Sequence, residues 1–215
     1  MLFEQIDADG DRNFAYLFAD EATREAVLVD PGGPTDRILD HVLGQNLEVK
    51  YVVNTHSHLD HSGGNRKVQD RTGARVVLHE SVCGRPDTEI GVKDGDELKV
   101  GGLTLKFIHT PGHTDDSVCV LCGNKLCTGD TLFVGKVGGT GFGEDAREEY
   151  DSIHQKIMTL PEDVEICPGH NYGVAPTSTV GHERRTNPFL LRKSFEEFVD
   201  LKRNWLEYKR IHGIA

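Results

Sequence analysis

The chain has 215 residues, of which 37% are hydrophobic and 27% carry a charge. This composition is typical of a folded globular protein and argues against a disordered chain. The formal net charge of -11 argues against a general nucleic-acid-binding protein, because contacts with phosphates require clustered lysine and arginine side chains.

Residues 1–10 lack the basic and apolar regions of a signal peptide, and no apolar run approaches the roughly 18 residues that span a bilayer. We therefore expect a cytoplasmic protein with no membrane partner. An odd number of cysteines in such a chain argues against a disulfide framework. The cysteines are Cys83, Cys119, Cys122, Cys127 and Cys167.

Short apolar runs rich in β-branched residues alternate with longer amphipathic stretches along the chain. The apolar runs predict strands at residues 14–19, 26–30, 49–54, 75–78, 103–109, 117–122, 125–128 and 164–167. The amphipathic stretches predict helices at residues 35–43, 64–72, 146–160 and 193–211.

Two pairs of predicted strands are separated only by short polar segments, which is typical of hairpins. One pair is 14–19 with 26–30, and the other lies on either side of Gly123-Asn124. A doubly wound parallel sheet would place helices between these strands. The order therefore favours two partly antiparallel sheets with helices outside them, in one domain over residues 1–215 with a C-terminal helical segment at about 188–213.

Cys119 and Cys122 form a C-x-x-C motif within a predicted strand. Such a motif can bind zinc or carry redox chemistry when it lies in a loop. On a strand, however, residues three apart point to opposite faces of the sheet. We therefore expect these two side chains to be packed thiols.

The most informative segment is residues 52–65, VVNTHSHLDHSGGN, in which three histidines and one aspartate fall within six residues. Zinc and related cations bind imidazole nitrogen and carboxylate oxygen at ~2.0–2.2 Å. Four such ligands cannot all reach one ion from a straight strand. A tight loop with two ions satisfies them, with His56 and His58 on one ion and Asp60 and His61 on its neighbour.

Three later segments share one form, in which a strand ends and a metal-binding residue follows beside small residues. They are FIHTPGHT with His113, LCTGDTL with Asp130, and VEICPGHNY with His170. Together with the first segment, these residues complete two coordination shells and leave positions open for water. Open positions distinguish a catalytic metal site from a closed structural one.

The succession of His-x-His-x-Asp-His, Pro-Gly-His-Thr, Thr-Gly-Asp-Thr-Leu and Pro-Gly-His resembles the metallo-β-lactamase-fold superfamily over about residues 14–170. The resemblance implies an α/β fold, an αββα sandwich of two mixed β-sheets flanked by helices. It also implies two divalent metal ions, with zinc expected and iron or manganese as alternatives. The implied ligands are His56, His58 and His113 for the first ion, Asp60, His61 and His170 for the second, and Asp130 as the bridge.

Within that superfamily, true metallo-β-lactamases usually carry cysteine at the position of Asp130, which argues against antibiotic hydrolysis. Residues 129–142 and 181–191 are similar to the short glyoxalase II-like group, the hydroxyacylglutathione thioesterases. Persulfide dioxygenases and short relatives tend to carry Gly-Arg-Thr-Asp-Phe after the aspartate motif. This chain has Gly-Thr-Gly-Phe at 139–142 instead.

We therefore predict a dinuclear metal-dependent hydrolase, a glyoxalase II-like thioesterase that cleaves a small-molecule thioester or ester with a metal-bridging hydroxide. Asp60 is the predicted catalytic residue, because it can bind metal and orient the nucleophile. Lys136 and Tyr172 are candidate substrate contacts. Asp30, between a strand and a turn, is a candidate partner for a metal-bound imidazole. The oligomeric state stays open.

Two alternatives belong to other classes. A mononuclear non-haem iron persulfide dioxygenase would use His56, His113 and Asp130, because two histidines and one carboxylate suit Fe(II) and O₂. A non-catalytic module would use the metal only to stabilise a binding surface. The complete ligand set argues against this second alternative.

Overall fold

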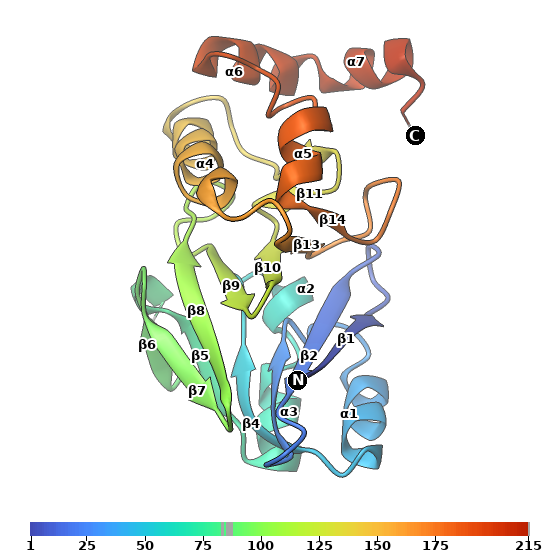
Figure 1. Cartoon of the computed structure of the whole chain (residues 1–215), viewed down its shortest axis with the longest axis vertical. Helices are drawn as coiled ribbons and strands as arrows, with labels where there is room; N and C mark the ends of the chain where they lie inside the picture. The colour runs from blue at the N-terminus through green and yellow to red at the C-terminus, as the bar shows by residue number, and fades with distance from the viewer. Residues whose placement is uncertain (83, 85–87, 215) are drawn as a thin grey trace.

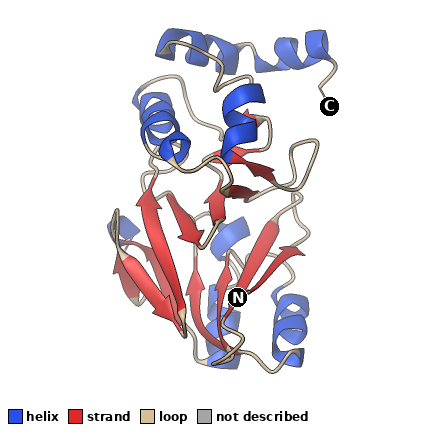
Figure 2. Ribbon diagram, in the orientation of Figure 1, coloured by secondary structure: helices blue, strands red, loops and turns tan. Residues whose placement is uncertain are grey.

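The computed structural model describes residues 1–82, 84 and 88–214; Cys83 lies outside the described residues. Two six-stranded sheets face each other, and helices cover their outer faces (Figures 1 and 2). Both sheets contain parallel and antiparallel strand pairs. The structure therefore confirms the expected αββα sandwich of two mixed sheets.

The first sheet has the strand order β1-β2-β3-β4-β5-β6. Its first three strands pair antiparallel and its last three add in parallel, with α1 and α3 as the crossovers. The elements are β1 (Leu2–Asp7), β2 (Phe14–Ala19), β3 (Glu25–Val29), α1 (Thr35–Gly44), β4 (Glu48–Val53), α2 (Leu59–Ser62), α3 (Asn65–Thr72), β5 (Arg75–His79), the short 3-10 helix Glu80–Val82, and β6 (Ile90–Val92).

The second sheet has the strand order β14-β13-β10-β9-β8-β7, and a small hairpin, β11-β12, lies beside it. The elements are β7 (Glu97–Val100), β8 (Leu103–His109), β9 (Val118–Cys122), β10 (Lys125–Gly129), β11 (Leu132–Phe133), β12 (Lys136–Val137), α4 (Glu144–Gln155), the 3-10 helix Ile157–Thr159, β13 (Glu165–Pro168), β14 (Ser178–Thr179), α5 (Val180–Thr186), α6 (Phe195–Arg203) and α7 (Trp205–His212).

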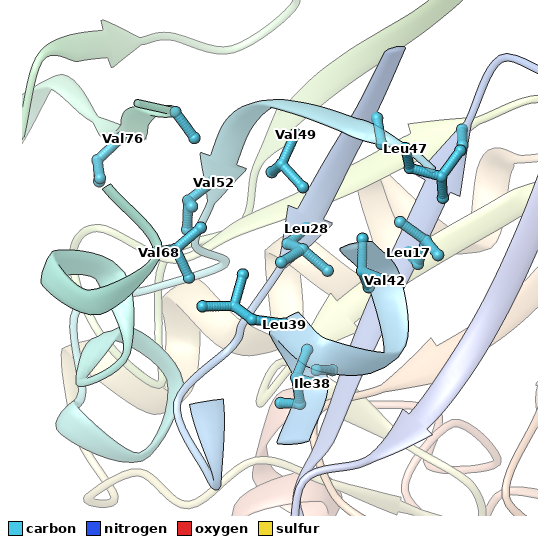
Figure 3. Close-up of a cluster of buried hydrophobic side chains, with 14 of the residues drawn as sticks. Leu17, Leu28, Ile38, Leu39, Val42, Leu47, Val49, Val52, Val68 and Val76 are labelled. Carbon is cyan, nitrogen blue, oxygen red and sulfur yellow. The ribbon is translucent and has the colours of Figure 1, made fainter. Parts of the chain in front are cut away.

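Three apolar layers hold the sandwich together, and strand alternation assigns side chains to them. On β2, Leu17 faces the helices α1 and α3, while Phe18 faces the second sheet. Figure 3 shows the layer beneath α1, where Leu39 of the helix packs among Leu28 and Val52 of the strands. The third layer lies between the second sheet and α4 to α7.

Several predicted elements need correction. The strands β1, β6 and β7 were not predicted. The strands β1 and β7 are partly exposed and carry charged residues that weaken the apolar pattern, and β6 has only three residues, with a glycine at its centre. The helix predicted at 193–211 is two helices, because Asn204 interrupts it, with its side-chain amide bonded to the Asp200 carbonyl at 2.9 Å. The helix α5 was also missed; seven residues are too few for a clear period.

The C-x-x-C motif lies on β9, as expected. Cys119 points into the layer beneath the outer helices, and Cys122 points between the two sheets. The four described cysteines are free and buried. Among the described residues, no helix is both long and apolar enough to cross a membrane.

Candidate metal centre

The predicted ligands meet at one end of the sandwich, where strands of both sheets finish. The first-sheet strand β4 runs directly into the loop that carries His56 and His58 and into α2, which carries Asp60 and His61. From the second sheet, His113, Asp130 and His170 follow β8, β10 and β13. In Figure 1, α2 lies beside β10 and below β13.

The first group of ligands is His56, His58 and His113. The Nε2 atom of His56 lies 2.9 Å from Nδ1 of His58, which lies 3.2 Å from Nε2 of His113. Neighbouring ligand atoms around a tetrahedral ion bound at ~2.0–2.1 Å are about 3.3 Å apart. The three nitrogens are therefore spaced as ligands of one ion.

The second group is Asp60, His61 and His170. The Oδ2 atom of Asp60 lies 3.4 Å from Nε2 of both histidines, and these two nitrogens lie 3.3 Å apart. This spacing also fits one ion. In each of these two groups, three ligand atoms of the predicted set lie close enough together to hold one ion without Asp130.

Asp130 lies between the two groups. Its Oδ1 atom is 3.3 Å from Nε2 of His61, and its Oδ2 atom is 3.4 Å from Nε2 of His170 and 3.7 Å from Nε2 of His113. Within the described part of the chain, Oδ1 is buried and accepts no hydrogen bond. A buried carboxylate oxygen of this kind is satisfied by a cation, so the donor set fits a metal centre.

The charges of the site are held by close contacts. Burial would raise the pKa of Asp130, but contacts with His170 and His61 hold it well below its usual range. Burial would lower the pKa of His61, but Asp30 and Asp130 outweigh that effect and raise it to about 10. Burial and the neighbouring His61 lower the pKa of His56 to about 3. The centre thus combines ionised carboxylates with neutral and protonated imidazoles. A cation would bind the carboxylates and the neutral imidazoles directly, and it would displace a proton from a protonated imidazole.

In three histidines the Nδ1–H group faces an acceptor, which leaves Nε2 as the ring atom that can bind a metal. Nδ1 of His113 donates to the Gly139 carbonyl at 2.8 Å, and Nδ1 of His170 donates to the Asp11 carbonyl at 2.9 Å. Nδ1 of His61 lies 3.1 Å from Oδ2 of Asp30. The structure therefore places Asp30 where the sequence predicts a partner for a metal-binding imidazole.

The turn after β3 supports the ligand loop. Asp30 has φ +52° and accepts hydrogen bonds from the Thr55 backbone N–H at 2.8 Å and from its hydroxyl at 2.6 Å. Gly32 touches the backbone of Asp60 so closely that a Cβ atom would lie 1.8 Å from its carbonyl oxygen. Only glycine fits at this contact, so the Pro-Gly-Gly-Pro turn packs directly against the backbone that carries Asp60.

A comparison with models of known protein families agrees with this geometry. The family model described as "Metallo-beta-lactamase superfamily" matches residues 8–170. The chain belongs to this superfamily.

Relatives of this chain in the metallo-beta-lactamase superfamily include persulfide dioxygenases and hydroxyacylglutathione hydrolases. The chain is 38% identical over 198 residues to human "Persulfide dioxygenase ETHE1, mitochondrial", covering 89% of this chain and 76% of that protein. It is 31% identical over 209 residues to "Hydroxyacylglutathione hydrolase GloC" of Haemophilus influenzae, covering 85% of this chain and 94% of that protein. The crystal structure of ETHE1 from Myxococcus xanthus is similar with a TM-score of 0.87 and 39% identity, covering 95% of this chain and 91% of that one.

A cavity of about 650 Å³ lies beside the metal centre of this superfamily member. The ring of Tyr172 forms one wall and stacks on His170, with centroids 4.7 Å apart and an interplanar angle of 3°. Lys136 lies with Nζ 4.7 Å from the Tyr172 ring, and Arg12 approaches the same ring to 4.8 Å. Lys209 of α7 also lines the cavity, so the two predicted substrate contacts stand beside two further cations.

Sequence reasoning missed the residues that hold this cavity in shape. Glu183 and Asn187 are fully buried; a Glu183 carboxylate oxygen accepts from the Gly135 backbone at 2.9 Å, and the Asn187 amide donates to the Lys136 carbonyl at 3.3 Å. It also missed Asn13, whose amide donates to Asp60 Oδ2 at 3.0 Å. The spacing of Glu183 and Asn187 places both on one face of a helix, but only the fold shows what they bind.

Proposed function

We propose that this chain is an iron-dependent persulfide dioxygenase that acts on a glutathione-type persulfide. The observation that carries the proposal is the likeness to ETHE1 proteins over nearly the whole chain, at 38% and 39% identity. The comparisons therefore favour the alternative predicted from the ligand set over the thioesterase that the sequence motifs favoured. Within the proposal, His56, His113 and Asp130 would hold the iron.

The reaction fits what this site can supply. A persulfide, R–S–SH, reacts with O₂ and water to give the thiol R–SH, hydrogen sulfite and a proton. The outer sulfur loses four electrons, and O₂ accepts them. Side chains cannot activate O₂, and Fe(II) bound to two imidazoles and a carboxylate supplies that chemistry. The Gly139 carbonyl keeps His113 in the tautomer whose Nε2 can bind.

The cavity beside the centre supports an acidic thiol compound as the substrate. Lys136, Arg12 and Lys209 line the cavity in a chain whose net charge is -11. Two acidic residues, Asp11 and Glu183, line it as well, and their carboxylates accept hydrogen bonds from the Tyr172 hydroxyl and the Gly135 backbone. Burial and the charge of Lys209 lower the pKa of Lys136, so a bound carboxylate would relieve unfavourable charge. Glutathione carries two carboxylates, and its sulfur would then lie toward the metal ligands beyond Tyr172.

A second candidate function rests on the second ligand group. Asp60, His61 and His170 converge as closely as the first group and share Asp130 with it. A mononuclear iron centre would leave these three residues without a catalytic use. They favour dinuclear hydrolysis of a hydroxyacylglutathione thioester, with zinc as the expected ion and Asp60 orienting the water.

One experiment separates the two functions. The protein is loaded in separate samples with Fe(II) and Zn(II), and metal content, O₂ uptake with glutathione persulfide, and thiol release from S-lactoylglutathione are measured on each. We expect one iron per chain, with O₂ uptake matched by sulfite formation. Two bound ions with thioester hydrolysis and no O₂ uptake would replace the dioxygenase with the hydrolase.

The variant His170→Ala sharpens this test. The dioxygenase ligands do not include His170, so O₂ uptake should persist in the variant. Hydrolysis by a dinuclear centre should collapse, because one ligand of the second ion is lost. Loss of O₂ uptake in a folded variant that keeps its iron would contradict the mononuclear assignment.

A further inference from the structure

A buried ion pair lies behind the metal centre, between α4 and α6. The ammonium of Lys202 contacts the carboxylate of Glu149, and their side chains are 6% and 0% exposed. Lys202 also donates to the carbonyl of Gly138 at 2.8 Å. Figure 1 shows α6 lying beyond α4, far along the chain from the ligand loops. Lys202 lies outside residues 8–170, the part matched by the superfamily.

The backbone that Lys202 holds leads to two metal ligands. Gly138 packs closely against both Asp130 and Glu149. A Cβ atom on Gly138 would lie 1.9 Å from the Asp130 carbonyl oxygen and 2.8 Å from a carboxylate oxygen of Glu149. The next residue, Gly139, accepts the hydrogen bond from Nδ1 of His113. The path from the ammonium to the imidazole therefore crosses one peptide unit.

Glu149 supports the same histidine from the other side. Gly112, directly before His113, has φ +138°, and a Cβ atom on it would lie 2.5 Å from the Glu149 backbone. The helix α4 thus packs against the peptide that precedes His113, while the carboxylate of Glu149 holds the ammonium that fixes the peptide that follows Gly138. The Glu149–Lys202 pair therefore supports His113 in two ways, through the peptide that precedes it and through the carbonyl that its ring bonds.

We propose that Lys202 and Glu149 are positioning residues for the metal centre: they fix the Gly138–Gly139 backbone and, through its carbonyl, the orientation of His113. This inference rests on the proposed role of His113 as a metal ligand, and it holds for either reaction. A pair that served only to join α4 to α6 would need no bond to Gly138. Burying both charges is costly, so the pair is by itself weak evidence for a role in stability.

The test measures Co(II) binding to the metal-free full chain, so it does not depend on activity. In Lys202→Met we expect about tenfold weaker binding at the site that contains His113, because loss of a partner that orients a ligand typically costs 10- to 100-fold in affinity. The visible Co(II) bands should also shift, since they report ligand geometry. Binding at the Asp60, His61 and His170 group should stay within twofold.

A matched control removes a different lysine from a different ion pair. Lys125 pairs with Glu165 at the start of β10 and β13, the opposite end of these strands from the metal ligands. Lys125→Met should lower the melting temperature and leave Co(II) affinity unchanged. Equal losses of affinity in both variants would mean that the effect of Lys202→Met is general destabilisation, and would overturn the proposal.

A second variant covers the case in which Lys202→Met fails to fold with Glu149 left unpaired. The double variant Glu149→Gln/Lys202→Met leaves no buried charge and keeps similar volumes, but it still lacks the bond to Gly138. We expect it to fold, as checked by circular dichroism, and to show the same weakened binding and shifted bands. Wild-type Co(II) affinity and spectrum in the folded double variant would overturn the positioning role.

Discussion

Replacing Asp30 by asparagine should weaken the metal site that contains His61. The Asp30 and His61 side chains are each 1% exposed, and Nδ1 of His61 lies 3.1 Å from Oδ2 of Asp30. Asparagine retains one carbonyl oxygen for the Thr55 backbone N–H, so its NH₂ group must face the Thr55 hydroxyl and His61. Nδ1 of His61 would then accept, and its proton would move to Nε2, the atom that faces the other ligands.

The expected magnitude follows from that change of tautomer. Losing a partner that orients a metal-binding histidine costs roughly 10- to 100-fold in affinity, which is about 1.4–2.7 kcal/mol. Asparagine tolerates the φ of +52° at this position, so the backbone should not change. Zn(II) added to the metal-free chain should therefore bind 10- to 100-fold more weakly at Asp60, His61 and His170, and its affinity for the first group should fall less.

The assay is a competition titration with Zn(II) and a chromophoric chelator, repeated on Asp36→Asn. Asp36 lies on the exposed side of α1, where its carboxylate pairs with Lys67 at 2.8 Å. The same substitution there should leave both affinities unchanged. If Asp30→Asn binds Zn(II) at every affinity found for the unmodified chain, Asp30 does not set the His61 tautomer and the reasoning is wrong.

Three further predictions concern ligands, substrate and core. Asp130→Ala should reduce the affinity for ions at both groups, because the two carboxylate oxygens of Asp130 face ligands of each group. His170→Ala should mainly affect an ion next to Asp60. Metal analysis that finds both sites intact in Asp130→Ala would exclude a shared ligand. Lys136→Met should raise KM for a glutathione substrate by about 10- to 150-fold with kcat changed less than twofold, since one charged hydrogen bond contributes about 1.5–3 kcal/mol. An unchanged KM would remove Lys136 from the substrate site. Leu28→Ala should reduce the free energy of unfolding by about 2–5 kcal/mol in urea titrations, because the side chain is fully buried beneath α1; a loss under about 1 kcal/mol would contradict that packing.

Four of the candidate ligands lie close together in the chain, so the sequence alone predicted that they meet. His56, His58, Asp60 and His61 follow one apolar strand at fixed spacing, so their meeting needs only a strand and a tight turn. The small residues beside His113, Asp130 and His170 mark strand ends in the same way. The continuous apolar run 14–19 likewise predicted a strand with the observed bounds, because a strand that is buried on both faces carries apolar side chains at every position.

The edge strands were not determined in this way. The strands β1, β6 and β7 have mixed, half-exposed sequences, and each is a strand because a neighbour supplies its hydrogen bonds. The same holds for the break at Asn204, where the local pattern favours one continuous helix. In these segments the preference of the chain is weak, so pairing and packing decided the structure.

The orientation of the ligands depended entirely on tertiary structure. Asp30 reaches His61 across 31 positions, the Asp11 carbonyl reaches His170 across 159, and Lys202 reaches Gly138 across 64. Residue type and spacing determine which atoms can bind a metal, because these are properties of short segments. Which ring nitrogen can bind a metal, and which cations line the cavity beside Tyr172, depend on partners that only the fold brings within hydrogen-bonding distance.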